Sequence, residues 1–142
     1  HLVVDASSAS VCSLSGRVVT ALTAGSCSIT ATTPASGTVA AGYARRSITI
    51  LGIAQSIDFD ADGALSGTPI RFGDHPALSA TTTSGLLVSL SGLPGAPCGI
   101  YYDLSGPTPI PHLGYTEPGS CTIVATQSGS SRYRAAEPVG KL

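Results

Sequence analysis

Hydrophobic and polar positions alternate over several short segments of this chain, a spacing typical of β-strands with one buried face. Short strands separated by turns rich in Gly, Pro and Ser predict an all-β fold, and their spacing favours a β-sandwich. No segment has a convincing helical period. The predicted strands are 17–22, 27–32, 46–51, 56–61, 77–82, 86–91 and 120–126, with a hairpin from 99–104 and 109–115.

One nine-residue stretch occurs twice in the chain. AGSCSITAT at 24–32 returns as PGSCTIVAT at 118–126, with six of the nine positions identical. Each copy has a second cysteine upstream, Cys12 for the first and Cys98 for the second. A repeat that carries its own cysteine pair indicates a modular unit. The chain therefore divides into two repeats, over residues 1–52 and 53–142.

Composition excludes several classes of partner. Charged residues make up 11% of the chain and the net charge is −1, which does not favour nucleic acid or an anionic membrane surface. The longest apolar runs, such as 48–53, are too short for membrane insertion as a spanning helix. A chain that is 42% hydrophobic, with 17 glycines and 10 prolines, is typical of a folded β-module rather than a disordered segment.

The four cysteines indicate the compartment. They allow three connectivities, and the symmetry of the repeat favours Cys12 with Cys27 and Cys98 with Cys121. Closing loops of this size stabilises each module by roughly 3 kcal/mol. Zinc is the competing interpretation, but no C-x-x-C spacing is present. We therefore expect an oxidising, extracellular setting, at the cell surface or after secretion.

Three segments in order carry a family resemblance: SIDF at 56–59, FGDHPALSATTTSGLLVSL at 72–90, and, after a cysteine, PGSCTIVATQSGSSRYRAAEPV at 118–139. This order resembles a bacterial immunoglobulin-like repeat, which occurs in tandem in large secreted or surface-anchored proteins of the adhesin type. The first unit resembles the later half of the same repeat. The resemblance implies tandem immunoglobulin-like β-sandwiches that serve as spacer, stalk or adhesin modules rather than as enzymes.

The two repeats are incomplete at opposite ends. Residues 53–85 supply the opening strands of the second repeat and have no counterpart in the first, which begins at about the position of Leu86. The second repeat lacks most of its last strand, just where the first continues with Thr49 and Ile50. The missing strands can come from neighbouring repeats of the same protein, or from another chain by strand exchange in a homo-oligomer. In a third arrangement the first unit packs as a reduced sheet on the second.

The second cysteine interval is eight residues longer than the first and carries an aromatic cluster. Tyrosines near proline-rich turns can stack on a sugar or a peptide. The competing interpretation is that they pack on their own enlarged hairpin. The candidate ligand-binding residues are Tyr101, Tyr102, His112 and Tyr115.

A second candidate site is the aspartate series Asp58, Asp60 and Asp62, followed by a glycine. This D-x-D-x-D-G spacing opens an EF-hand calcium loop, but Pro69 stands where that loop needs a bidentate Glu. On a strand the same spacing places the three aspartates on the solvent face and the alternate apolar residues in the core. Calcium is the one cofactor that the sequence suggests.

The sequence does not support catalysis. Asp74 and His75 are adjacent, but no nucleophile motif accompanies them. The first functional hypothesis is therefore a non-catalytic extracellular structural or spacer module. The alternative is a binding module that recognises a glycan, or a protein on a host or other cell surface, through the tyrosine-bearing hairpin between Cys98 and Cys121.

Overall fold

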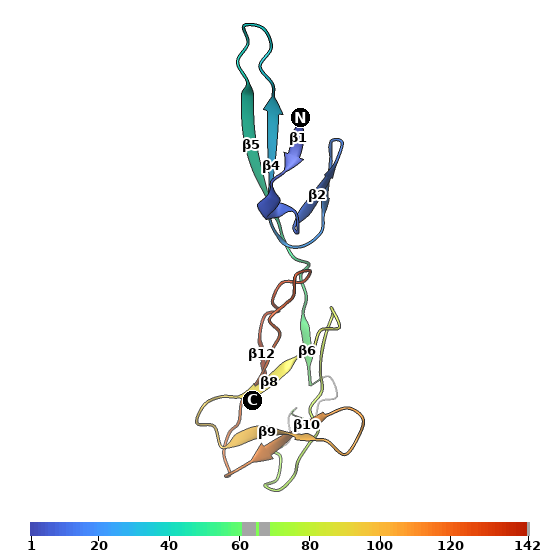
Figure 1. Cartoon of the computed structure of the whole chain (residues 1–142). Coiled ribbons are helices and arrows are strands. Elements are labelled where there is room, and N and C mark those ends of the chain that lie inside the picture. Colours follow the sequence, from blue (N-terminus) through green and yellow to red (C-terminus); the bar gives the residue numbers. More distant parts are fainter. Residues whose placement is uncertain (61–64, 66–68, 142) are drawn as a thin grey trace. The chain divides into compact units, whose positions relative to one another are not determined.

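A computed structural model describes residues 1–60, 65 and 69–141, and it confirms the all-β class. All strand pairings within its sheets are antiparallel, and no α-helix occurs in the described part of the chain. The chain forms two compact units (Figure 1). Unit 1 consists of His1–Ile53 and Ser130–Arg134, and unit 2 consists of Ala54–Gly129 and Ala135–Leu142.

Unit 1 is built from one three-stranded sheet and one hairpin. The sheet has the order β1-β4-β5, with β1 at Leu2–Val4, β4 at Gly25–Thr33 and β5 at Gly42–Ile50. The hairpin consists of β2 (Cys12–Ser15) and β3 (Val18–Ala21), and a short 3₁₀ turn at Ala6–Ser8 precedes it. The β4–β5 hairpin is the longest feature of this unit in Figure 1.

Glycine makes both tight hairpins of unit 1 possible. Gly16 (φ 60°) opens the two-residue turn between β2 and β3, and Gly37 (φ 58°) lies at the tip of the β4–β5 hairpin. There, Ser36 and Val39 exchange backbone hydrogen bonds of 3.0 Å. A positive φ at the first turn position is typical of hairpin turns that match the twist of the strands, and glycine adopts it without steric cost.

A segment near the end of the sequence completes unit 1. The Ile53 amide donates to the Arg132 carbonyl at 2.8 Å, and the Arg134 amide donates back to the Ile53 carbonyl at 2.9 Å. The Ala24 amide donates to the carbonyl of Ser131 at 2.9 Å. These bonds join Ala24, the first residue of the first motif copy, and Ile53, which follows that copy, to a stretch that follows the second copy.

The described part of unit 2 contains one three-stranded sheet and two two-stranded sheets. The three-stranded sheet has the order β12-β11-β8. The other two are the pair β6–β7 and the hairpin β9–β10. The bounds are β6 Ile57–Phe59, β7 Ala80–Thr82, β8 Ser89–Gly92, β9 Cys98–Asp103, β10 Ile110–Tyr115, β11 Ile123–Thr126 and β12 Val139–Lys141.

The hydrophobic core of the described residues lies in unit 2. Strand β6 contacts β11 and β12, so residues of facing sheets pack together in a manner consistent with a β-sandwich. Apart from Cys12 and Cys27, no hydrophobic residue in the described part of unit 1 is buried. The core residues are Ile57, Phe59, Leu78, Leu113, Ile123, Ala125 and Ala136.

One predicted strand, 77–82, is divided between two sheets. Ala80–Thr82 forms β7 and pairs with β6. The preceding residues instead pair with β10: the Leu78 amide donates to the Pro111 carbonyl at 2.7 Å, and the Leu113 amide donates to the Pro76 carbonyl at 3.0 Å. A strand that changes partner in this way connects the layers of a sandwich.

The two units repeat the same arrangement in the same register. Strand β1 pairs with β4 through Leu2 and Ala31, and β8 pairs with β11 through Leu90 and Ala125. On the other side, β5 pairs with β4, and β12 pairs with β11. The hairpins β2–β3 and β9–β10 each begin at the upstream cysteine of their unit. Strands β1 to β5 of unit 1 therefore correspond to β8 to β12 of unit 2.

This correspondence shows what each unit lacks. In the described part of unit 1, no strand pair corresponds to β6–β7. Strand β12 has three residues where its counterpart β5 has nine.

The start of the first repeat needs a small correction: because Leu2 takes the place of Leu90, His1 corresponds to Ser89 and not to a residue near Leu86. Unit 1 has a longer β1–β2 connection, which holds the 3₁₀ turn.

Candidate functional site

Each unit contains the disulfide that the repeat symmetry favours. Cys12 joins Cys27 with a Cα–Cα distance of 5.8 Å, and Cys98 joins Cys121 at 5.9 Å. The described part of the chain has no free cysteine. Disulfides of this kind form and persist in oxidising compartments.

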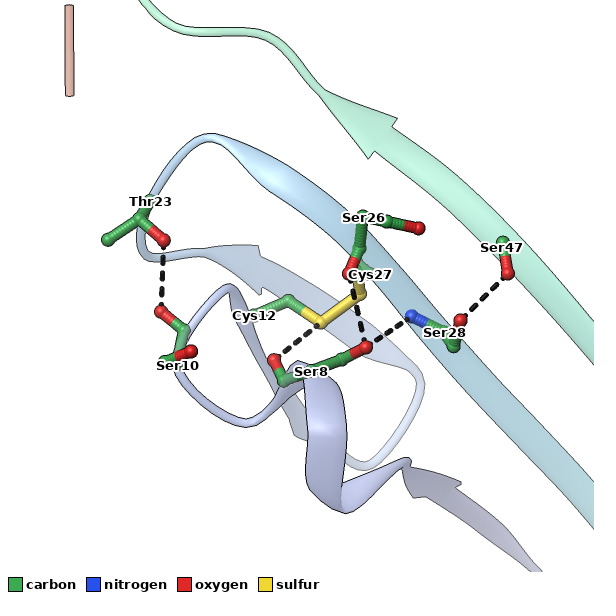
Figure 2. Close-up of a disulfide and its surroundings, with 8 residues drawn as sticks. All are labelled: Ser8, Ser10, Cys12, Thr23, Ser26, Cys27, Ser28 and Ser47. Atoms are coloured by element: carbon green, nitrogen blue, oxygen red, sulfur yellow. Dashed lines mark hydrogen bonds between the residues drawn. A yellow bond between two sulfur atoms is a disulfide. The ribbon is translucent and has the colours of Figure 1, made fainter. Parts of the chain in front are cut away.

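Serine side chains surround the disulfide of unit 1 (Figure 2). The Ser8 hydroxyl donates to the Ser26 carbonyl at 3.1 Å and accepts from the Ser28 amide at 3.0 Å. The hydroxyls of Ser28 and Ser47 are 2.7 Å apart and link β4 to β5. Ser8 and Ser28 are both buried, so these bonds satisfy polar groups that have little access to water.

The repeated glycine has a steric role in both units. A Cβ on Gly25 would lie 3.0 Å from a methyl carbon of Val11, the residue before Cys12. A Cβ on Gly119 would lie 2.8 Å from the Pro97 ring, again beside the upstream cysteine. In both units, therefore, the motif glycine lets the second cysteine strand approach the residue that precedes its disulfide partner.

The longer hairpin of unit 2, β9–β10, carries an aromatic cluster on its outer face. Tyr101 and His112 are cross-strand partners, and their rings stack with centroids 5.4 Å apart and planes 17° apart. His75 meets Tyr101 edge to face, also at 5.4 Å. Tyr101 is 43% exposed, so part of its ring is open to a ligand although the cluster also packs on itself.

Backbone hydrogen bonds orient both histidine rings of this cluster. Nδ1 of His75 donates to the Leu113 carbonyl at 3.2 Å, and Nδ1 of His112 donates to the His75 carbonyl at 2.9 Å. Since a carbonyl oxygen only accepts, each neutral ring keeps its proton on Nδ1 and its lone pair on Nε2. With both rings neutral, the cluster therefore offers an aromatic surface and an Nε2 acceptor on each histidine.

The four predicted ligand-binding residues do not converge on one place. Along each strand of the hairpin, successive side chains point to opposite faces. Tyr102 and Tyr115 therefore lie on the face of the buried Leu113, and Tyr101 and His112 lie on the other face. Tyr102 borders a groove lined by residues of 78–90 and 109–111, and Tyr115 borders a separate hollow. The structure thus brings together only Tyr101 and His112, and adds His75 from a distant segment.

The tip of the same hairpin is fixed by an aspartate. The Ser105 amide donates to Oδ1 of Asp103 at 2.9 Å. This bond, with a second from the Ser105 side chain, lowers the pKa of Asp103, and the nearby charge of His112 acts in the same direction while desolvation opposes it. The carboxylate form therefore holds the turn at neutral pH.

The aspartate series does not form the surface that its spacing predicts. Asp58 is exposed on β6 between buried Ile57 and Phe59, as the strand interpretation expects. Asp60, however, is buried: both of its carboxylate oxygens accept from the Leu65 amide, at 3.1 and 3.0 Å, so it does not share the solvent face. Asp62 lies outside the described residues.

No group of three or more His, Cys, Asp or Glu side chains is placed to hold a metal ion among the residues that the structure describes. The calcium hypothesis therefore stays a prediction.

No family model, curated protein or solved structure matches this chain. The described residues also contain no helix that is both long enough and apolar enough to cross a membrane.

Proposed function

We propose that this chain is a non-catalytic extracellular structural module, an immunoglobulin-like spacer of a bacterial surface or secreted protein of the adhesin type. The observation that carries the proposal is the repetition itself. Both units pair their strands in the same register around a disulfide at the same place. A unit that is copied with its register and its covalent link is typical of a modular array, and we propose that this array acts as a spacer.

The disulfides suit such a role. Proteases outside the cell cut unfolded chains more readily than folded ones. A disulfide reduces the number of conformations open to the unfolded chain, and this stabilises the folded module. This matters most for unit 1, whose only buried hydrophobic residues in the described part of the chain are Cys12 and Cys27. Neighbouring repeats of the same protein are the partners that this role requires.

The spacer function can be tested by surface display. The chain is placed between a bacterial surface anchor and a reporter domain, and compared with a flexible Gly-Ser linker of the same number of residues. We expect the reporter to survive a protease that cuts the flexible linker, and to lose this protection after treatment with reductant. Cleavage of the chain as fast as the linker, with its disulfides intact, would contradict a spacer.

A second candidate function is favoured by the half-exposed cluster of Tyr101, His112 and His75. A binding module would use this outer face of β9–β10 to stack on a glycan or on a protein side chain. The test is a glycan array and a cell-binding assay with the intact protein and with Tyr101→Ala. Tyr43→Ala is the matched control, because Tyr43 is 71% exposed on β5 of unit 1.

Loss of binding in Tyr101→Ala but not in Tyr43→Ala would support recognition by the hairpin. If the intact protein binds no glycan and no cell, or if Tyr101→Ala binds as well as the intact protein, the hairpin has no such role.

A further inference from the structure

The equivalence of the two units identifies an open half-core in unit 1. Six positions of the β8–β12 arrangement belong to the core of unit 2 or pack against it: Leu90, Ile100, Leu113, Ile123, Ala125 and Val139. Their counterparts by strand register are Leu2, Leu14, Val19, Ile29, Ala31 and Ala44. All six are apolar, yet none of them is buried.

In five of the six pairs the residue of unit 1 is the more exposed one. Leu113 is 1% exposed and its counterpart Val19 is 37% exposed. Leu2 is 42% exposed, although its counterpart Leu90 is packed against the core. The opposite face of the same sheet is polar, because there Asp5 pairs with Arg45 at 2.6 Å and accepts from the Thr30 hydroxyl at 2.6 Å. Unit 1 therefore has an amphipathic sheet whose apolar face lacks a cover among the described residues.

In unit 2 the cover is known. Ile57 and Phe59 of β6 point into the core, and β6 contacts β11 and β12, the counterparts of β4 and β5. This cover is the element that has no counterpart in the described part of unit 1. We infer that the apolar face of unit 1 is a docking site for a strand pair of the β6–β7 type, with aliphatic or aromatic residues at alternate positions of its first strand.

Charge also favours this occupant over a second copy of the same face. Arg46 lies on the apolar side of β5, at the position that Lys141 takes in β12, and Arg46 is exposed. Two such faces stacked on each other would bury a guanidinium from each copy, which is costly without a paired carboxylate. In unit 2, strand β6 turns Ile57 and Phe59 toward the core and leaves Asp58 exposed, so a strand pair of this type covers the apolar face without bringing a second guanidinium to it.

The register defines the experiment. Because His1 corresponds to Ser89, a second copy of residues 54–88 fused directly before His1 places a β6–β7 pair where unit 1 lacks one. The control is the same fusion with Ile57→Asp and Phe59→Asp in the added copy only. Hydrogen exchange of β4 and β5 amides, binding of an apolar dye and molar mass in solution are measured for both fusions and for the original chain.

We expect the added copy to slow exchange in β4 by at least about tenfold and to reduce dye binding, because burial of even one large aliphatic side chain is worth about a decade in an equilibrium constant. The Asp-bearing control should exchange like the original chain. Equal behaviour of the two fusions would overturn the inference. It would also be overturned if the original chain is a dimer with protected β4 amides that Leu2→Asp makes monomeric, since the occupant is then a second copy. This inference does not depend on whether the protein is a spacer or a binding module.

Discussion

Replacing one isoleucine of the repeated motif in each unit tests whether the two cores differ as the structure shows. Ile123 and Ile29 occupy the same motif position, but Ile123 is 1% exposed in the core of unit 2, whereas Ile29 is only partly buried in unit 1. The two substitutions, Ile123→Ala and Ile29→Ala, remove the same three carbon atoms from the same strand position. Any difference between them therefore reports the surroundings and not the residue type.

The expected magnitudes follow from burial. Three buried carbons contribute about 2.4 kcal/mol at about 0.8 kcal/mol each, and a cavity in a closed core adds to this. We therefore expect Ile123→Ala to lower the free energy of unfolding of unit 2 by about 3–4 kcal/mol. Ile29 is only partly buried, so Ile29→Ala loses only part of the free energy gained by removing these carbons from water, and it leaves no closed cavity. We therefore expect the free energy of unfolding of unit 1 to fall by about 1 kcal/mol.

Hydrogen exchange with mass spectrometry gives the opening free energy of each unit separately, and denaturant titration checks the sum. A difference of about 2 kcal/mol corresponds to a roughly 30-fold difference in the change of exchange rate. If Ile123→Ala does not fold, the pair Ile123→Val and Ile29→Val keeps the comparison at about 0.5–1.5 kcal/mol for the buried site. Equal losses in the two units would mean that Ile29 lies in a closed core, and the half-core of unit 1 would be refuted.

Three further predictions concern the motif, the disulfides and the hairpin. Gly119→Ala places a Cβ 2.8 Å from the Pro97 ring, so we expect it to lower the melting temperature of unit 2, while Gly99→Ala, which meets no atom within 4 Å, should have a smaller effect. Reduction of the disulfides, or replacement of Cys98 and Cys121 by Ala, should cost unit 2 about 3 kcal/mol, measured by denaturant titration with and without reductant. Because the pKa of Asp103 is lowered in the folded state, its stabilising effect is present above its ordinary pKa of 3.8 and is lost as pH falls through the lower folded value. Amide exchange of the hairpin should thus depend more steeply on acid in the original chain than in Asp103→Asn.

Each of these predictions has a clear contrary outcome. A Gly119→Ala protein as stable as the original would show that the Pro97 ring moves aside freely. Indifference of the melting temperature to reductant would contradict the contribution of the disulfides and weaken the case for an oxidising compartment. Identical acid profiles for Asp103→Asn and the original chain would mean that the Asp103 carboxylate does not hold the turn.

The class of fold and the repeat could be predicted from sequence because both depend on local patterns. Alternation located β3, β4 and both strands of the β9–β10 hairpin to within a few residues. It missed β1, whose Leu-Val-Val sequence does not alternate, and also β2, although its CSLS sequence alternates. It also could not divide 77–82 between two sheets, since alternation says which face a residue takes but not which edge pairs with which strand.

The candidate site was predicted only where it is local. Tyr101 and His112 meet because they are cross-strand partners in a hairpin that the sequence locates. His75 joins them through the pairing of residues 76–78 with β10, a long-range contact that no short pattern reveals. Asp60 was wrongly placed on the solvent face because its backbone leaves the strand with φ 59°, where the alternation of side chains ends.

The shared motif itself explains why a specific function is better sought where the units differ. Four of its six identical positions are accounted for by packing: the glycine permits close approach, the cysteine forms the disulfide, and the isoleucine and alanine face the core side of the sheet. Side chains that serve the fold in this way are not free to recognise a ligand. The longer hairpin of unit 2 presents Tyr101 and His112 on its outer face, opposite the face that carries the buried Leu113. A substitution in this outer face can therefore change the exposed surface without changing the fold, whereas a substitution in the motif changes the fold first.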